Sequence, residues 1–181
     1  MSCVVVERVW EEPAESAAIR AIEDRGARCL EIHSVRFLQS YVSTDARRMI
    51  CLYEAPDAES VRAAQRQAGM PVTRVWTATL VERRPVHALP SEGRASGNRE
   101  LVVVERTLPE PLDDATNAAI AARMEGCMEL HGVDYLRAHV ALDGRRMVCI
   151  FRAPDAESVR LANRQAGAPF DCAWSAALHE A

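Results

Sequence analysis

The chain has 181 residues, of which 49% are hydrophobic, and a formal net charge of −4. This mild negative charge excludes the strongly basic surface of a typical nucleic-acid-binding domain, and no apolar run is long enough to cross a membrane. The first residues lack the basic and apolar regions of a signal peptide. We therefore expect a cytoplasmic protein that binds neither nucleic acid nor membrane, with its six cysteines as reduced thiols.

One segment of the sequence occurs twice. Val4–Arg8 aligns with Val102–Arg106, and the same offset places Ala55–Arg62 on Ala153–Arg160 without a gap. A copy of this size can bury only a modest core by itself. The repeat therefore predicts two small domains that pack together, rather than one domain with a single core.

Each copy shows the same order of elements. Runs of β-branched residues predict strands, and Pro or Asp before a helical pattern predicts a helix start. Gly69 followed by Pro71 ends the second helix of the first copy. In chain order, the first copy is expected to contain a strand over Val4–Arg8, a helix over Pro13–Ile32, strands over Val35–Val42 and Met49–Tyr53, a helix over Pro56–Gly69 and a strand over Arg74–Val81.

The order strand, helix, strand, strand, helix, strand is the ferredoxin-like arrangement of the α+β class, in which the helices leave one sheet face open. We expect two tandem ferredoxin-like βαββαβ repeats, residues 1–82 and 101–181, joined by a Pro- and Gly-containing linker over residues 83–100. If the two open faces cover each other, the repeats form a pseudo-dimeric α+β barrel.

Alternation along the strands divides their side chains between two faces. We expect Leu52 and Ile150 to face the helices. The remaining aromatic, sulfur-containing and polar side chains would then line a pocket between the two sheets, where a small hydrophobic organic molecule could bind. These candidate ligand-binding residues are Phe37, Gln39, Met49, Cys51, Tyr53 and Thr77 in the first copy, and Tyr135, Met147, Cys149, Phe151 and Ser175 in the second.

The two copies differ most at the polar positions of this set. Arg137 replaces Gln39, and His139 replaces Tyr41. Histidine titrates near neutral pH, an arginine fork can hold a carboxylate or an enolate, and a tyrosine hydroxyl can transfer a proton. This pattern suggests a cofactor-independent enzyme of the cyclase or isomerase type, with His139 as the base, Arg137 as the anion clamp and Tyr41 as the proton donor. The same residues also fit a purely structural interface.

A second pattern repeats at the end of each first helix. Cys29 and His33 lie four residues apart, as do Cys127 and His131. Two ligands are too few for a zinc site. We interpret each histidine as a helix cap that the helix dipole favours.

Several motifs resemble the bacterial "nickel-binding protein" family, namely Phe37–Val42, Cys51–Asp57 and Gly69–Pro71. The resemblance implies a ferredoxin-like fold close to the dimeric α+β barrel proteins, which include cofactor-free cyclases, isomerases and monooxygenases. The family pattern often has one histidine where this chain has Gln39 or Arg137, and another where it has Ala64 or Ala162.

These replacements lead us to expect no metal, and the acid–base residues His139, Arg137 and Tyr41 would need no cofactor. A non-catalytic nickel-binding protein and a small-ligand-binding module are alternatives to the enzyme, and further homodimerisation is left open by the sequence.

Overall fold

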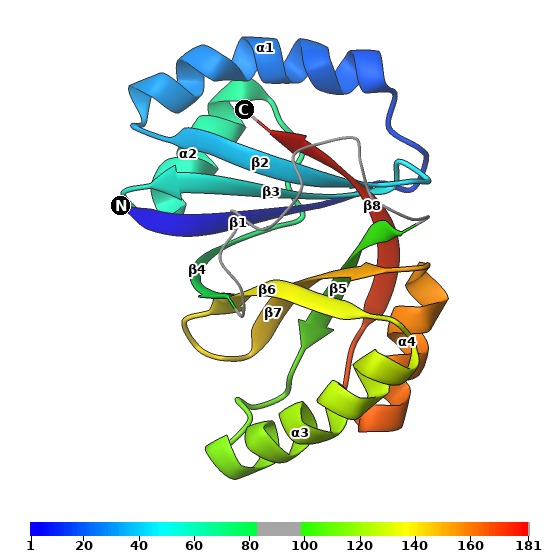
Figure 1. Ribbon diagram of the computed structural model, residues 1–181. Helices are drawn as coiled ribbons and strands as arrows, with labels where there is room; N and C mark the ends of the chain where they lie inside the picture. The colour runs from blue at the N-terminus through cyan, green and yellow to red at the C-terminus, as the bar shows by residue number, and fades with distance from the viewer. Residues whose placement is uncertain (83–98, 181) are drawn as a thin grey trace. The chain divides into compact units, whose positions relative to one another are not determined.

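The computed structural model describes residues 1–82 and 99–180, so most of the linker predicted over residues 83–100 lies outside the described residues. Both copies fold as predicted, with the order βαββαβ (Figure 1). The first repeat consists of β1 (Ser2–Val9), α1 (Ser16–Ile32), β2 (Arg36–Ser43), β3 (Arg48–Ala55), α2 (Ala58–Ala68) and β4 (Arg74–Glu82). The second consists of β5 (Glu100–Thr107), α3 (Asp114–Leu130), β6 (Asp134–Ala141), β7 (Arg146–Ala153), α4 (Ala156–Ala166) and β8 (Cys172–Glu180).

Three of the four helices begin with an aspartate cap. The side chain of Asp57 accepts a hydrogen bond from the Ser60 backbone N–H at 2.7 Å, and Asp155 accepts one from Ser158 at the same distance. Asp113 caps α3 in the same way. A carboxylate there satisfies an N–H group that lacks a partner within the helix.

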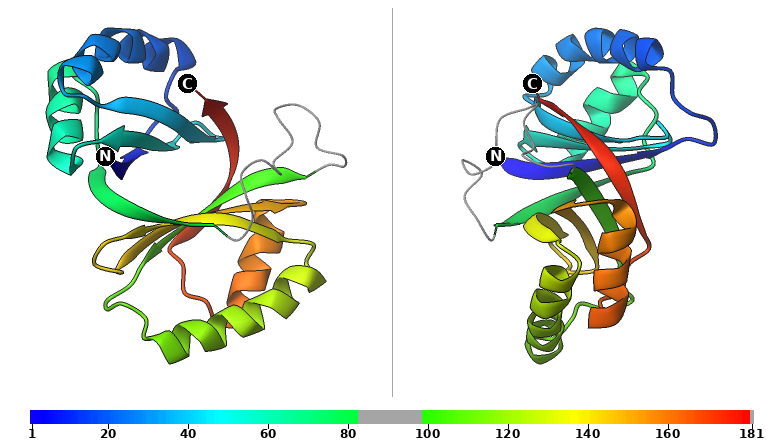
Figure 2. Two further views of the ribbon diagram at one scale, coloured as in Figure 1. Left: turned by 60° about the vertical axis from the view of Figure 1, so that its left-hand side comes forward. Right: turned by 45° about the vertical axis from the view of Figure 1, so that its right-hand side comes forward.

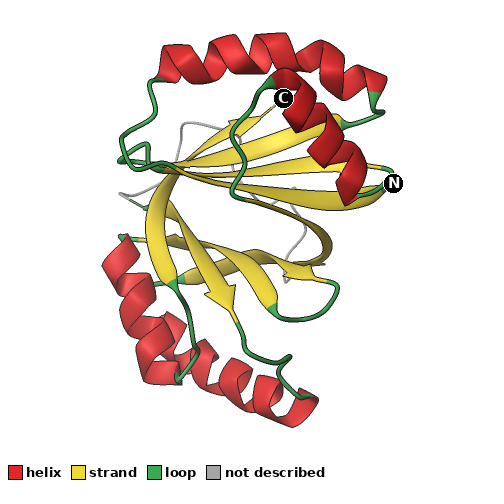
Figure 3. Ribbon diagram, turned by 180° about the vertical axis from the view of Figure 1, so that it is seen from behind, coloured by secondary structure: helices red, strands yellow, loops and turns green. Residues whose placement is uncertain are grey.

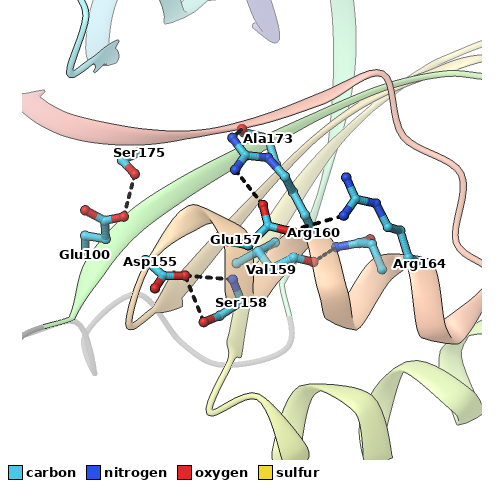
Figure 4. A network of polar contacts seen from close by, with 10 residues as sticks. Glu100, Asp155, Glu157, Ser158, Val159, Arg160, Arg164, Ala173 and Ser175 are labelled. Carbon is cyan, nitrogen blue, oxygen red and sulfur yellow. Dashed lines mark hydrogen bonds and ion pairs between the residues drawn. The ribbon is translucent and has the colours of Figure 1, made fainter.

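The surface of α4 adds a network of side-chain bonds (Figure 4). Glu157 accepts hydrogen bonds from Arg160 at 3.0 Å and from Arg164 at 3.2 Å. Arg160 also donates to the backbone carbonyl of Ala173, at 2.5 Å. This last bond ties α4 to β8, so the helix is held against the sheet of its own repeat.

Each repeat forms an antiparallel sheet. The strand order is β4-β1-β3-β2 in the first repeat and β8-β5-β7-β6 in the second. Within each repeat, both helices lie on one face of the strands (Figures 1 and 3). None of the helices in the described part of the chain has the length and apolar character of a membrane-spanning segment.

The chain divides into two compact units, Met1–Ala78 with Ala177–Ala181, and Thr79–Ala176. Each unit has a hydrophobic core on the helix-covered face of its sheet. The core of the first repeat is centred on Val4, Val6, Met49, Cys51, Tyr53 and Val61, and that of the second on Val102, Val104, Met128, Cys149, Phe151 and Val159.

These cores correct the face assignment made from the sequence for β3 and β7. Met49, Cys51 and Tyr53 pack on the helix-covered face, as do their counterparts in β7. Leu52 and Ile150 therefore point the other way. Both faces of these strands are apolar and buried, so hydrophobicity could not distinguish them.

A β-bulge explains a second error. The pairing of β2 with β3 shifts between Phe37 and Gln39, and that of β6 with β7 shifts between Tyr135 and Arg137. A bulge inserts one residue and reverses the alternation beyond it. Phe37 and Tyr135 consequently lie on the helix-covered face, although Gln39 and Arg137 do not.

The fourth strands also differ from expectation. Thr77 is directly opposite Val4, and Ser175 is directly opposite Val102. Residues directly opposite each other in a ladder share a face. Thr77 and Ser175 therefore lie on the helix-covered face, and Ser175 donates a hydrogen bond to Glu100 (Figure 4).

Leu52 and Ile150 are buried even though they face away from the helices, with 2% and 1% of their surface exposed. We predict that truncating either to Ala lowers the free energy of unfolding by about 2–5 kcal/mol, because a cavity replaces a packed aliphatic group. Urea denaturation measures this loss. Leu142, which is 73% exposed, provides the control substitution to Ala. A loss below about 1 kcal/mol for Leu52→Ala and Ile150→Ala would contradict the packing described.

Candidate functional site

A cavity of about 560 Å³ lies within the unit Thr79–Ala176, on the helix-covered side of the sheet of the second repeat. Figure 2 shows α3 running along this side of the strands. Helix α3 contributes Ile120, Met124 and Met128 to the wall, and the loops after β5 and α4 contribute Leu108, Leu112, Ala168 and Pro169. The strands contribute Tyr135, Ala138, Val140, Met147, Cys149 and Phe151, with Val81 and Glu82 from the end of β4.

The composition of α3 explains why space remains beneath it. Met124 and Met128 are its buried residues along 17 positions. They are spaced one turn apart and therefore lie on one face of the helix. Alanines fill many of the other positions, so little side-chain volume reaches the sheet. Methionine is flexible and adapts to irregular shapes, which suits a wall that must fit a bound molecule.

One lining residue is both charged and buried. Arg106, at the end of β5, is 7% exposed. It donates a hydrogen bond to Asn163 Oδ1 at 2.6 Å and another to the carbonyl oxygen of Pro169. Asn163 is itself fixed because its Nδ2 donates to the Val159 carbonyl at 2.7 Å. The guanidinium is therefore held in one orientation at the cavity wall.

The other charged lining residues are exposed. Glu82 and Glu125 lie on the solvent side of the cavity wall, where water and salt screen their charges. The site thus combines an apolar interior with a buried cation and two exposed carboxylates. A small number of fixed polar groups in an apolar cavity is typical of a small-molecule site.

The first repeat has an equivalent arginine with an additional neighbour. Arg8 donates to Gln65 Oε1 at 2.8 Å and to the Pro71 carbonyl. Burial raises the pKa of the Tyr53 hydroxyl, and hydrogen bonding with Gln65 and Arg8 acts in the opposite direction. Tyr53 therefore supplies a neutral hydroxyl beside Arg8. Phe151 occupies the equivalent position in the second repeat and has no hydroxyl.

Four of the predicted ligand-binding residues line this cavity. Tyr135, Met147, Cys149 and Phe151 do so, although they lie on the helix-covered face rather than between two sheets. The rings of Tyr135 and Phe151 make an edge-to-face contact with centroids 5.6 Å apart. The binding roles assigned to the residues of the first repeat stay predictions.

The predicted catalytic residues lie on the other sheet face of their repeats. In β6, Arg137 and His139 alternate with Ala138 and Val140, which line the cavity, so Arg137 and His139 point away from it. Tyr41 is buried in β2, and its hydroxyl is 2.6 Å from the Nε2 donor of Gln39. That Tyr41 joins Arg137 and His139 in one site stays a prediction.

Burial, with the Arg137 charge as a second cause, lowers the pKa of His139 from 6.5 to about 4. The imidazole is therefore neutral at pH 7. A base with so low a pKa accepts a proton weakly near neutral pH, and this limits the reactions that it could assist.

The positions at which the resembled family often has histidine do not fit a nickel ion in this chain. Arg137 is cationic, and the side chains of Ala64 and Ala162 are buried in the helix-side cores. Within residues 1–82 and 99–180, no three His, Cys, Asp or Glu side chains are grouped to hold a metal ion. Imidazole, thiolate and carboxylate are the side-chain groups that commonly bind nickel.

The repeated histidines lie at the helix ends, as predicted, and their role toward the helix dipole stays a prediction. His33 and His131 are the C-terminal caps of α1 and α3. His33 Nε2 lies 3.1 Å from Gln67 Oε1, and His131 Nε2 lies 2.9 Å from Gln165 Oε1. Each histidine thus connects the two helices of its repeat.

Sequence reasoning missed Arg106, Asn163, Met124 and Met128. A signal was present for the arginine, because alternation places it on the same face as Val102 and Val104, the face buried beneath the helices. A charged residue at the end of such an apolar stripe is unusual and therefore informative. Its distance to Asn163 could not be obtained from the sequence.

The family model described as "Nickel responsive protein SCO4226-like" matches residues 5–77 and 103–174. The chain belongs to this family. The two matched segments correspond to the two repeats. SCO4226 from Streptomyces coelicolor A3(2) is 18% identical, with a TM-score of 0.38 over 41% of this chain and 91% of SCO4226. A search of curated proteins finds no match.

Two chlorite dismutase structures resemble the whole chain. The chlorite dismutase-like protein TA0507 is 15% identical, with a TM-score of 0.53 over 99% of this chain and 94% of that protein. The chlorite dismutase from Candidatus Nitrospira defluvii, in complex with imidazole, is also 15% identical, with a TM-score of 0.51 over 97% and 90% of the respective chains. This likeness concerns the fold alone, and it confirms the predicted class of tandem ferredoxin-like repeats of the α+β barrel type.

The depressed pKa of His139 gives a pH-dependent prediction. The folded protein binds a proton at this group only below about pH 4, whereas the unfolded chain binds one below about pH 6.5. The contribution of His139 to the free energy of unfolding is therefore fully present above pH 6.5. It falls by up to about 3 kcal/mol as the pH is lowered toward 4.

We expect His139→Leu to flatten the fall in unfolding free energy between pH 6.5 and 4, as measured by urea denaturation at a series of pH values. His179, which is exposed, provides the control variant His179→Leu, whose profile should follow that of the unmodified protein. Parallel profiles for His139→Leu and the unmodified protein would contradict the assignment.

Proposed function

We propose that this protein binds a small, largely apolar organic molecule in the cavity beneath α3 of the second repeat. The observation that carries the proposal is the cavity of about 560 Å³ itself, whose interior wall is apolar apart from the buried Arg106. Its size lies within the range of small-molecule sites. The chemical character of the ligand agrees with that expected from the sequence, but its place is the helix-covered side of one sheet.

The shape of the wall supports an aromatic or branched aliphatic ligand. Tyr135 and Phe151 present two rings in a fixed edge-to-face arrangement, and a planar molecule can stack on such rings. Met124 and Met128 on the opposite side can adjust to its outline. The same wall offers no set of side chains suited to a metal ion.

Nickel responsiveness belongs to the description of the family. For this chain we do not propose a nickel site, since Gln39, Arg137, Ala64 and Ala162 supply neither imidazole nor carboxylate. The proposal is therefore an organic ligand held by the second repeat.

Acid–base catalysis is a second candidate function. Arg137 is buried beside His139 and contributes to lowering its pKa, and groups with strongly shifted pKa values gather at functional sites. Because His139 is neutral and weakly basic at pH 7, a cyclase or isomerase reaction would need a substrate with an acidic C–H or O–H group. Arg137 would stabilise the anion that forms.

The binding proposal predicts the behaviour of the neutral fluorescent probe N-phenyl-1-naphthylamine. We expect saturable binding of one probe per chain, with increased fluorescence. Ala138→Phe, which fills the cavity from β6, should weaken binding about tenfold or more because the ring occupies the volume of the probe. Ala177→Phe, at an exposed position of β8, is the matched control and should bind normally.

Circular dichroism must show that Ala138→Phe is folded, and the smaller Ala138→Leu extends the series if it is not. Unchanged probe affinity in a folded Ala138 variant, or no saturable binding to the unmodified chain, would contradict the proposed function.

The catalytic candidate predicts a different pattern. For any substrate that the protein converts, His139→Ala and Arg137→Ala should each lower kcat by about 100-fold or more, as expected when an acid–base or charge-stabilising group is removed. Gln39→Ala, at the position equivalent to Arg137, is the control and should have a smaller effect. An unchanged kcat in both His139→Ala and Arg137→Ala would show that neither residue is catalytic.

A further inference from the structure

We propose that the ligand of the second-repeat cavity carries one anionic group, a carboxylate in the first instance, which binds to Arg106. This inference rests on the proposed function, since it specifies the chemical class of the molecule in the same cavity. The observation behind it is the positive charge of Arg106, which is buried in a cavity wall whose interior is otherwise apolar.

Arg106 is a buried cation without a carboxylate partner among the described residues. Its hydrogen bonds go to two neutral acceptors, Asn163 Oδ1 and the Pro169 carbonyl. The neighbouring Glu105 lies on the other face of β5, where it accepts a hydrogen bond from Trp174 at 2.8 Å and lies 3.8 Å from Arg146. Burying an uncompensated charge is costly, and an anionic ligand would supply the missing compensation.

The guanidinium group of Arg106 has N–H donors that these two hydrogen bonds do not use. An arginine has five N–H donors in a planar fork, and the bonds to Asn163 and Pro169 use two of them. Those bonds fix the plane of the group without neutralising it. A fork held in this manner can bind both oxygens of a carboxylate.

The comparison between the two repeats supports the same conclusion. In the first repeat, Tyr53 places a neutral hydroxyl beside Arg8 and Gln65. In the second, Phe151 lines the cavity without that hydroxyl. The change removes an oxygen from beside the arginine, at a position where Phe151 and Arg106 both line the cavity, and an oxygen of the ligand can take its place.

The carboxylates of the wall do not argue against an anion. Glu82 and Glu125 are exposed, so their repulsion is screened by solvent. Arg106 is desolvated, so its attraction is much less screened. The anionic group would therefore lie in the interior beside Arg106, with the apolar body of the ligand along Met124, Met128 and Phe151.

The test compares three molecules with the same ring system as competitors of N-phenyl-1-naphthylamine: 1-naphthaleneacetate, the neutral 1-naphthaleneacetamide and the cationic 1-naphthylmethylamine. We expect the acetate to bind about 10- to 100-fold more tightly than the acetamide, as for a charge-assisted pair of hydrogen bonds. The amine should bind more weakly than either.

Arg106→Gln should reduce the preference for acetate over acetamide to less than about threefold. Arg8→Gln is the matched control, because it breaks the equivalent bonds in the first repeat and should leave the preference intact. Phe151→Tyr retains the arginine but restores the hydroxyl of the first repeat. It should weaken acetate binding several-fold with little change for acetamide, and it provides the test if Arg106→Gln does not fold.

The outcomes separate the two proposals. If the neutral probe does not bind, the proposed function fails. If the probe binds and all three competitors displace it equally, or the amine is preferred, the cavity binds ligands but the anionic class is wrong. If the preference for acetate persists in both Arg106→Gln and Phe151→Tyr, Arg106 does not bind the anionic group and the inference is wrong.

Discussion

A buried arginine at the end of the first strand connects the sheet of each repeat to the second helix and the loop that follows it. Arg8 contacts Gln65 and Pro71, and Arg106 contacts Asn163 and Pro169. A cation at this depth is tolerated only with oriented acceptors around it. The position of α4 on its sheet, and hence one end of the cavity, depends on this set of bonds.

The two repeats satisfy the same requirement in different ways. In the first, the Tyr53 hydroxyl adds a third neighbour to the arginine. In the second, a phenylalanine and a shorter amide replace the tyrosine and the glutamine, and the arginine reaches a cavity wall. Duplication within one chain permits such divergence, whereas two identical subunits would carry the same residues at both sites.

The sequence was sufficient for the order of elements and insufficient for the faces of the strands. The runs Val4–Arg8 and Val102–Arg106 predicted strands, and the pattern over Pro56–Gly69 predicted a helix. The structure confirms these elements. A β-bulge leaves no clear sign in the residue types around it, so alternation across Phe37 to Gln39 was read in the wrong phase.

The candidate site could be predicted from the sequence even less well than the strand faces. Met147, Cys149 and Phe151 were predicted to bind a ligand because alternation places them on the face opposite Ile150, which was taken to be the open face. Strand β7 is apolar on both faces, so nothing local could show which face is covered by the helices. Arg106 owes its role to Asn163 and Pro169, which lie 57 and 63 residues away in the sequence. Relations of this kind come from tertiary packing, which one sequence without its homologues does not reveal.

The small side chains around the cavity are informative about why the space exists. Alanines 121, 122 and 138 line it, and a longer aliphatic side chain at such a position commonly stabilises a protein by about 0.5–2 kcal/mol when it fills unused space. Helix α4 of the same repeat shows that this chain can pack a helix closely, since five of its residues are buried along 11 positions. A space beneath α3, beside a charge that packing alone would not favour, agrees with the proposed binding of an anionic ligand.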